Sequence, residues 1–290
     1  MEKIATALQR KLRTEAPGDS LFGSLDEPPP AANASSSVLV PGPISYTHSR
    51  VVEISPQVLE RHRVAVVANE GSADAFRLLR TQLLMELRKN NWQTLAITSP
   101  NKGAGKSTVS LNLAISFAME VDCTALLVDA DLRDPDLRHL LELEPGPGLA
   151  DYLVGEAALE DLLIHPRIGN LAILPGGKPV ANTSELMRSP MMASLVRELR
   201  NRYPERFILF DVPPVLSGAD TLALSGYMDA TILLVEERKT ARDDVERACE
   251  MLRNSNLLGI VLNKSRELPE PDPITRPKPG FFRRILGPGE

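Results

Sequence analysis

Short apolar segments alternate with segments of helical periodicity through the middle of this chain. Apolar residues three and four positions apart predict helices at Asp74–Lys89, Lys106–Glu120, Pro190–Arg202 and Ala241–Asn254. Continuous apolar runs predict buried strands at Thr94–Thr98, Ala125–Asp129, Leu171–Leu174, Phe207–Asp211, Thr231–Val235 and Gly259–Leu262. This alternation predicts an α/β fold, in which a mostly parallel sheet is flanked by helices on both faces.

The two ends of the chain differ in composition from this middle part. Ile4, Leu8 and Leu12 are four residues apart and predict one short amphipathic helix. Pro, Ser, Ala and Gly are frequent over Ala16–Ser49, which is typical of a flexible linker. The predicted segments are a helix, a linker, a folded domain and a proline-rich basic tail, over residues 1–15, 16–69, 70–266 and 267–290.

Composition and charge restrict the class of protein. The chain has 290 residues, of which 43% are hydrophobic, and its net charge of −5 argues against a general nucleic-acid binder. No apolar run approaches the ~20 residues of a membrane span, and the N-terminus lacks the apolar core of a signal peptide. Cys123 and Cys249 are isolated in the sequence, which indicates no disulfide framework and fits a reducing cytosol.

Residues Pro100–Thr108 have the pattern of a phosphate-binding loop between a strand and a helix. Small residues let backbone N–H groups converge on phosphate oxygens, and the helix N-terminus adds the positive end of its dipole. Lys106 would reach the β- and γ-phosphates, and the Ser107 hydroxyl would bind Mg²⁺. Pro100 stands where the usual pattern begins with glycine. The predicted nucleotide-binding residues of this loop are Gly103, Ala104, Gly105, Lys106, Ser107 and Thr108.

Carboxylates follow two of the predicted strands. Asp129 and Asp131 come after one apolar strand, and Asp211 ends another. In open parallel sheets, ligands bind at the carboxyl ends of the strands, where these acids fall. Asp211 would hold a metal ion directly or through water. The alternative is that the acids only end strands or cap helices, but two such strands together with a phosphate loop favour a functional site.

Several motifs, in order along the chain, resemble those of bacterial tyrosine kinases, the cytoplasmic kinases of capsule and exopolysaccharide export. Asp129-Ala130-Asp131-Leu132-Arg133 resembles their second Walker A motif. Ala75–Thr81 resembles their oligomerisation helix, Asn182–Leu186 their Asn-Pro-x-Glu-Leu segment, and Val261–Lys264 the strand whose asparagine contacts adenine. The resemblance is closest to the tyrosine autokinases of exosortase-linked exopolysaccharide clusters.

The resemblance implies a P-loop NTPase fold and transfer of the γ-phosphate of ATP to tyrosine, with Mg²⁺ as the second cofactor. Lys106, Asp129 and Asp131 would be catalytic, with Asp129 acting as base toward the tyrosine hydroxyl or positioning it. Ser107, Asp131 and Asp211 would hold the metal ion. Phosphoryl transfer needs mainly positioning and charge neutralisation, and this set of residues supplies both.

The resemblance also implies partners. Asn263 would contact adenine, and Asp74, Arg77 and Arg80 would contact the neighbouring subunit of a homo-oligomeric ring; Asp74 stands where the family has glutamate. A membrane polysaccharide co-polymerase, which sets chain length, would activate the kinase at the inner face of the plasma membrane. Basic residues interleaved with Phe, Ile and Leu in the tail predict a peripheral contact with anionic lipid, and the alternative is a solvated tail.

The tyrosines of this chain depart from the family pattern. Family members usually carry a tyrosine cluster at the C-terminus as the autophosphorylation target, but none lies beyond Tyr227 here. Tyr46 falls in the predicted linker and is the accessible one, whereas Tyr152, Tyr203 and Tyr227 are expected to be partly buried. The chain would therefore phosphorylate other proteins, use Tyr46, or act without kinase activity. Thr183, in place of the family proline, is expected to matter little.

Two other functions stay open. The first is a nucleotide switch that positions cargo, like the partition ATPases, which carry a signature lysine five residues before the loop lysine. Asn101 occupies that position and Lys102 follows it, which weighs against a switch. The second is a scaffold that binds ATP structurally and recruits an export complex.

Overall fold

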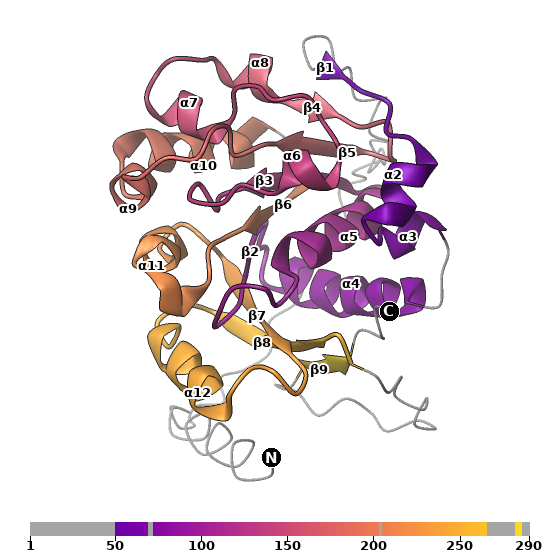
Figure 1. Ribbon diagram of the computed structural model, residues 1–290, viewed down its shortest axis with the longest axis vertical. Helices are drawn as coiled ribbons and strands as arrows, with labels where there is room; N and C mark the ends of the chain where they lie inside the picture. The colour runs from indigo at the N-terminus through magenta and orange to yellow at the C-terminus, as the bar shows by residue number, and fades with distance from the viewer. Residues whose placement is uncertain (1–49, 69–71, 203–204, 266–281, 286–290) are drawn as a thin grey trace, which may run out of the picture. The chain divides into compact units, whose positions relative to one another are not determined.

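A computed structural model describes residues 50–68, 72–202, 205–265 and 282–285 (Figure 1). The described strands form one sheet in the order β1-β4-β5-β3-β6-β2-β7-β8-β9. They are β1 (Arg50–Val51), β2 (Thr94–Thr98), β3 (Thr124–Asp129), β4 (Ile164–His165), β5 (Leu171–Leu174), β6 (Arg206–Asp211), β7 (Ala230–Glu236), β8 (Leu257–Asn263) and β9 (Phe282–Ile285). Every pair of neighbours is parallel except β4 and β5, which confirms the predicted, mostly parallel sheet.

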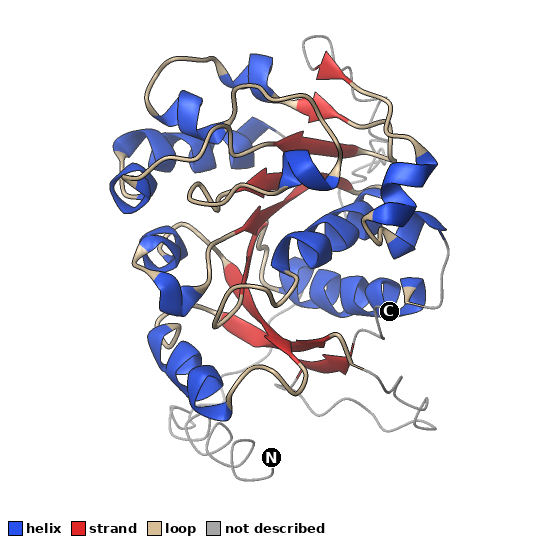
Figure 2. Ribbon diagram, in the orientation of Figure 1, coloured by secondary structure: helices blue, strands red, loops and turns tan. Residues whose placement is uncertain are grey.

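Helices cover both faces of this sheet (Figure 2). On one face lie α2 (Pro56–Arg61), α3 (Ala65–Ala68), α4 (Ala73–Lys89), α5 (Lys106–Ala118) and α6 (Leu137–Leu140). On the other lie α7 (Leu149–Leu153), α8 (Leu159–Leu162), α9 (Thr183–Met187), α10 (Pro190–Arg202), α11 (Asp220–Ser225), α12 (Arg242–Met251) and the 3₁₀ turn η1 (Val215–Ser217). The predicted helices and strands match these bounds closely, and β2, β5 and α10 match residue for residue.

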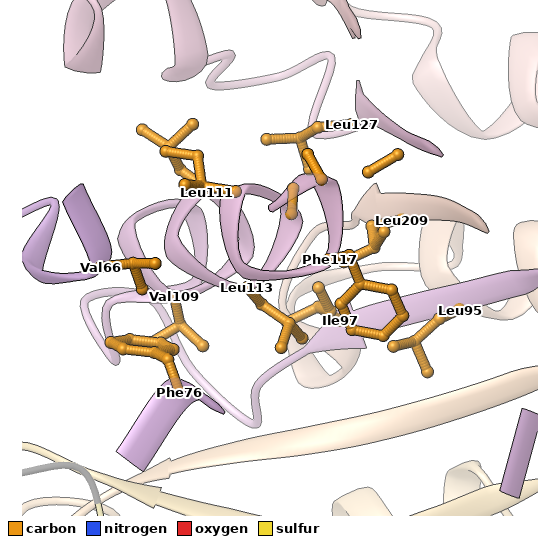
Figure 3. Packing of buried hydrophobic residues seen from close by; sticks show 14 of the residues in the cluster. Val66, Phe76, Leu95, Ile97, Val109, Leu111, Leu113, Phe117, Leu127 and Leu209 are labelled. Carbon is orange, nitrogen blue, oxygen red and sulfur yellow. The ribbon is translucent and has the colours of Figure 1, made fainter. Parts of the chain in front are cut away.

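Alternate residues of the central strands supply the two cores. Leu95 and Ile97 of β2 pack against α4 and α5, whereas Ala96 between them faces the opposite layer. Figure 3 shows how α5 sits in the first core, with Phe117 against β2 and Phe76 of α4 beneath the same helix. Because α5 is buried on nearly all sides, its first residues are held in one position relative to the strand ends.

The folded part begins earlier than the linker boundary that we placed at residue 69. Residues 50–68 form β1, α2 and α3. Ser55 caps α2 by accepting a hydrogen bond from the Val58 N–H at 3.4 Å, with Pro56 as the first helical residue. Leu59 and Val64 are buried in the first core, and this burial outweighs the linker-like composition nearby.

The two ends of the chain lie largely outside the described residues. The predicted helix over residues 1–15 falls there, as do Tyr46 and most of the predicted tail. Within that tail, Phe282–Ile285 forms β9 and pairs in parallel with β8, so this part is a strand. In the described part of the chain, Cys123 and Cys249 are free thiols, and none of the helices has the length and apolar character needed to cross a membrane.

Candidate nucleotide and phosphoryl-transfer site

The phosphate loop joins the end of β2 to the start of α5, as the sequence predicts. Gly103 and Gly105 have φ angles of 85° and 84°, a left-handed conformation that favours glycine. A Cβ atom on Gly105 would lie 2.6 Å from the Asn263 Nδ2 atom, closer than real contacts allow. Both the backbone angle and the close approach of β8 therefore require glycine at this position.

Two side chains that are distant in the sequence, at the end of β8, hold the carbonyl groups of this loop. Asn263 Nδ2 donates a hydrogen bond to the Ala104 carbonyl at 2.7 Å, and Lys264 Nζ donates to the Gly103 carbonyl at 2.8 Å. Lys264 Nζ also lies 3.3 Å from Glu236 Oε1 at the end of β7. In a trans peptide the N–H points away from the C=O, so the N–H groups of Ala104 and Gly105 face the opposite side of the loop. We predicted Asn263 as an adenine contact; the structure gives it this support role, and the adenine contact stays a prediction.

Lys106 and Asp131, both predicted site residues, form an ion pair. Lys106 Nζ lies 3.5 Å from Asp131 Oδ2, and both side chains are about nine-tenths buried, with 9% and 10% of each exposed. Burial raises the pKa of Asp131, while the positive charge of Lys106 opposes that rise. The lysine is therefore held beside an acid at the start of α5.

Asp129 is buried at the end of β3. Its Oδ2 atom accepts hydrogen bonds from the backbone N–H groups of Asp136 and Leu137 at 3.0 and 3.1 Å, and Oδ1 has no partner among the described residues. Burial, followed by the nearby charge of Asp211, raises the pKa of Asp129 well above the usual range. A fixed carboxyl with a raised pKa and a lone pair available is suited to accept a proton.

Asp211 lies on the neighbouring strand, directly beside Asp129 in the β3–β6 register. Its Oδ1 atom accepts a hydrogen bond from Ser110 Oγ at 3.2 Å, and its buried Oδ2 has no hydrogen-bond partner among the described residues. Burial raises the pKa of Asp211 to about 6, and the charge of Lys106 opposes this rise. Two buried carboxylate oxygens without partners lie at the carboxyl ends of adjacent strands, where a cation would satisfy them.

These residues fit a magnesium–nucleotide complex. Within the described residues there is no cluster of three or more His, Cys, Asp or Glu that would hold a metal ion alone. Mg²⁺ usually takes one or two carboxylates and completes its octahedron with water and phosphate oxygens. Ser107 is the second residue of α5, next to Lys106, so Ser107, Asp131 and Asp211 offer the kind of incomplete ligand set that a bound nucleotide would complete.

A cluster that we did not predict holds the turn after β3 from outside. Arg133 Nε donates to Thr183 Oγ1 at 2.9 Å and to Asp220 Oδ2 at 2.7 Å, and the Thr183 hydroxyl donates to the same Asp220 oxygen at 2.9 Å. A second contact with the same turn is exposed: Lys102 Nζ lies 3.0 Å from Asp134 Oδ2. Thr183 therefore bridges Arg133 and the buried Asp220 in a partly buried network, which differs from the minor role that we expected when it replaces proline.

The predicted oligomer contacts separate into two groups. Asp74 Oδ1 and Arg77 Nη1 form an exposed ion pair of 2.7 Å on α4, and their contact with another subunit stays a prediction. Arg80 is different, because its side chain is largely buried and pairs with Glu120 at 2.6 Å and with the Ser116 carbonyl at 3.2 Å. In this chain Arg80 joins α4 to the end of α5, and both of its Nη atoms are engaged within the subunit.

The fold and the site together define a P-loop NTPase. The family model ParA, described as a NUBPL iron-transfer P-loop NTPase, matches residues 91–270. Tyrosine-protein kinase YwqD of Bacillus subtilis is 30% identical over 208 residues, which cover 71% of this chain and 86% of YwqD. Tyrosine-protein kinase CpsD of Streptococcus agalactiae is 31% identical over 195 residues, or 66% of this chain and 82% of CpsD. This chain belongs to the bacterial tyrosine-protein kinase family within that class, which confirms the resemblance of its motifs.

A solved structure agrees with this assignment. The kinase domain of the Escherichia coli tyrosine kinase ETK is 25% identical, with a TM-score of 0.65 over 73% of this chain and 88% of that domain. The nucleotide and divalent metal that the P-loop NTPase family requires fit the residues described above.

Proposed function

We propose that this chain is an ATP- and Mg²⁺-dependent protein-tyrosine kinase that regulates exopolysaccharide or capsule polymerisation and export. The observation that carries the proposal is the position of Asp129, a buried carboxyl with a raised pKa beside the Lys106–Asp131 pair. A P-loop ATPase that only hydrolyses ATP needs to orient water, whereas a kinase needs a base that accepts the proton of a hydroxyl. Asp129 meets that second requirement.

Different residues have different roles in the proposed reaction. The N–H groups of the phosphate loop and Lys106 bind the β- and γ-phosphates and oppose the charge that spreads over them during transfer. Ser107, Asp131 and Asp211 would hold Mg²⁺, which would neutralise phosphate charge. The tyrosine oxygen attacks the γ-phosphorus in line with the leaving ADP oxygen, and Asp129 takes the phenolic proton.

The cellular setting belongs to the same proposal. The kinase works in the cytoplasm, at the inner face of the plasma membrane, where a polysaccharide co-polymerase activates it. Its copies assemble as a ring through the exposed Asp74–Arg77 face of α4. The basic tail adds a peripheral contact with anionic lipid.

The partition-type switch is less well supported. In such a switch the signature lysine must be available to the nucleotide of a second subunit. Lys102 instead pairs with Asp134 of its own chain, and Asn101 donates to Asp244 at 2.7 Å. A scaffold that binds ATP without turnover remains the second alternative. A scaffold would have no use for buried carboxylates with raised pKa values, so these residues do not favour it.

Incubation of the full chain with Mg²⁺, radiolabelled ATP and a glutamate–tyrosine copolymer tests the proposal. We expect phosphotyrosine in the copolymer, and the Lys106→Ala variant should lower its formation about 100-fold or more, because it removes the principal phosphate charge partner. Lys89→Ala, an exposed lysine at the end of α4, is the matched control and should retain full activity. ATP binding without any phosphotyrosine would rule out the kinase and leave the scaffold.

A further inference from the structure

The carboxyl group of Asp129 depends on the position of α6. Its Oδ2 atom accepts hydrogen bonds from the N–H groups of Asp136 and Leu137, at the start of that helix. α6 has only four residues, and so short a helix is not stable alone in water. Contacts with other segments must therefore fix α6, and through it the carboxyl group that would accept the phenolic proton.

Arg138, the residue after Leu137, ties α6 to the loop that follows it. Its Nη1 atom donates to the Glu144 carbonyl and its Nη2 atom to the Pro147 carbonyl, both at 2.7 Å. A Cβ atom on Gly146 would lie 3.2 Å from Nη2, so the guanidinium group lies directly against the backbone of this loop. Two carbonyl groups in fixed directions match the planar fork of an arginine better than the single ammonium group of a lysine.

The next residues attach this loop to the segment after β5. The Leu149 N–H donates to the Pro175 carbonyl at 2.7 Å, and the Ala150 N–H donates to the Gly176 carbonyl at 3.0 Å. A Cβ atom on Gly148 would lie 2.2 Å from the Pro175 oxygen, so the two backbones are in direct contact. The loop that the guanidinium group holds is therefore fixed to the segment after β5 as well.

The segment after β5 also lies next to Asp129. A Cβ atom on Gly176 would lie 3.4 Å from the Asp129 Cγ atom, 3.3 Å from the Asp129 carbonyl oxygen and 2.7 Å from the Pro135 Cβ atom. The carboxyl group therefore has two backbone neighbours, the N–H groups of α6 and the peptide at Gly176. Through the loop after α6, the Arg138 side chain connects these two supports.

A second contact holds the chain just after α6. Glu142 pairs with Arg61 and, at 3.2 Å, with His62, and so connects this part of the chain to α2. Most of the Arg61 side chain is exposed, and water weakens exposed ion pairs. Arg138 is only partly exposed, and its Nε atom is buried. The hydrogen bonds of Arg138 are therefore the stronger of the two supports of α6.

We propose that Arg138 is a positioning residue for phosphoryl transfer, which fixes α6 and the loop after it and thereby the place of the Asp129 carboxyl group. This inference rests on the proposed function, in which Asp129 takes the phenolic proton. Arg138 itself touches neither ATP nor the acceptor. A displacement of about 1 Å at a reacting group can cost about 100-fold in rate, so a side chain that only holds the base in place is able to control the reaction.

A double-mutant cycle with Asp129→Asn tests the inference on the full chain, with transfer to the glutamate–tyrosine copolymer as the measurement. Arg138→Met keeps an unbranched side chain but removes its donors, and we expect kcat to fall about tenfold while the Kd for ATP stays the same. In the Asp129→Asn background the same change should lower kcat less than about twofold, because the group that Arg138 positions is already absent. Arg253→Met, at an exposed arginine after α12, is the matched control and should retain full activity.

Arg138→Lys is the second variant of the cycle. Its ammonium group can bond one of the two carbonyl groups, so we expect a kcat about threefold below that of the wild type, above that of Arg138→Met. If Arg138→Met shows no cooperative unfolding in urea, Arg138→Lys takes its place, and its effect should disappear in the Asp129→Asn background.

Several results would overturn the inference while the proposed function stands. An equal loss of kcat in the wild-type and Asp129→Asn backgrounds would show that Arg138 acts on another part of the site. An unchanged kcat with a lower free energy of unfolding would make Arg138 a structural residue only, and weaker ATP binding with an unchanged kcat would assign it to the nucleotide side. Absence of phosphotyrosine with the wild-type chain is a separate result, which would end the proposed function and the inference together.

Discussion

The phosphate side and the acidic side of the site are built by different means. On the phosphate side, the site is shaped mainly by the backbone. Two glycines take left-handed angles, and Asn263 and Lys264 donate hydrogen bonds to loop carbonyls. On the acidic side, Asp129 and Asp211 are buried with carboxylate oxygens that lack hydrogen-bond partners among the described residues. The first side is stable without a ligand, whereas the second is electrostatically unfavourable until a cation or a proton arrives.

The largest expected effect comes from neutralising the acidic side. We expect Asp211→Asn to lower phosphoryl transfer about 100-fold or more, because it removes a carboxylate that we propose as a metal ligand. Asp243→Asn, an exposed acid of α12, is the matched control. Transfer to the copolymer measures the effect, and an activity loss below about tenfold would remove Asp211 from the metal site.

Asp211→Asn should lower activity but raise the stability of the folded chain. Burial raises the pKa of Asp211 from 3.8 to about 6, so between these values the folded chain binds more protons than the unfolded chain. The free energy of unfolding of the wild-type chain therefore falls as the pH rises toward about 6. Above that pH, the destabilisation by the buried charge of Asp211 is fully present. Without ligands, Asp211→Asn should be more stable than the wild type at pH 7.5, by about 1–3 kcal/mol, but not at pH 4. Urea unfolding at both pH values measures this difference, and equal shifts at both would contradict it.

The phosphate side is best tested with two glycines that share a backbone angle. Gly105 and Gly155 have φ angles of 84° and 80°, but a Cβ at Gly155 would meet nothing within 4 Å. Both alanine variants carry backbone strain of about 1–2 kcal/mol, and only Gly105→Ala adds the clash with Asn263. We expect nucleotide affinity to fall about tenfold or more in Gly105→Ala and to stay unchanged in Gly155→Ala. Calorimetric titration measures both, and equal losses would place the cause in strain alone.

The smallest effect should come from the outer support of the acidic side. Thr183→Val removes the hydroxyl that bridges Arg133 and Asp220, at a cost of about 1 kcal/mol, or about fivefold in rate. Because the turn that it holds carries Asp131, we expect kcat to fall while the Kd for ATP stays the same. Thr183→Ser keeps the hydroxyl and should restore kcat. If the valine and serine variants have equal kcat values, the network has no part in catalysis.

Local signals in the sequence account for most of the predicted fold and site. Runs of mostly apolar residues give β2 and β5 their observed bounds, because strands buried on both faces favour apolar side chains. The structure places three predicted site residues where the sequence motifs put them, namely Lys106, Asp131 and Asp211. Each motif fixes its lysine or acid near the end of a strand or loop. These features depend on residues that are close together in the chain.

The features that were missed depend on residues far apart. Arg133 lies 50 residues from Thr183 and 87 from Asp220, and no local pattern connects them. The reversal of β4 was missed for a similar reason, because a strand of two residues carries no periodicity and its direction is set by packing against β5. Composition hid β1 and α2 within a predicted linker, although Ser55-Pro56 is a helix start of the same kind as Ser189-Pro190.

The bond between Asn263 and Ala104 has a consequence for synthesis. It joins residues 159 positions apart, so a ribosome that adds about 5–20 residues per second completes the loop's supports about 8–30 s after it makes the loop. During that interval the nascent chain carries the nucleotide motif without the side chains that hold it in shape. We expect ATP to bind only after β8 has left the ribosome. Prematurely terminated chains that lack β8 would therefore contain the phosphate-loop motif but would not bind ATP.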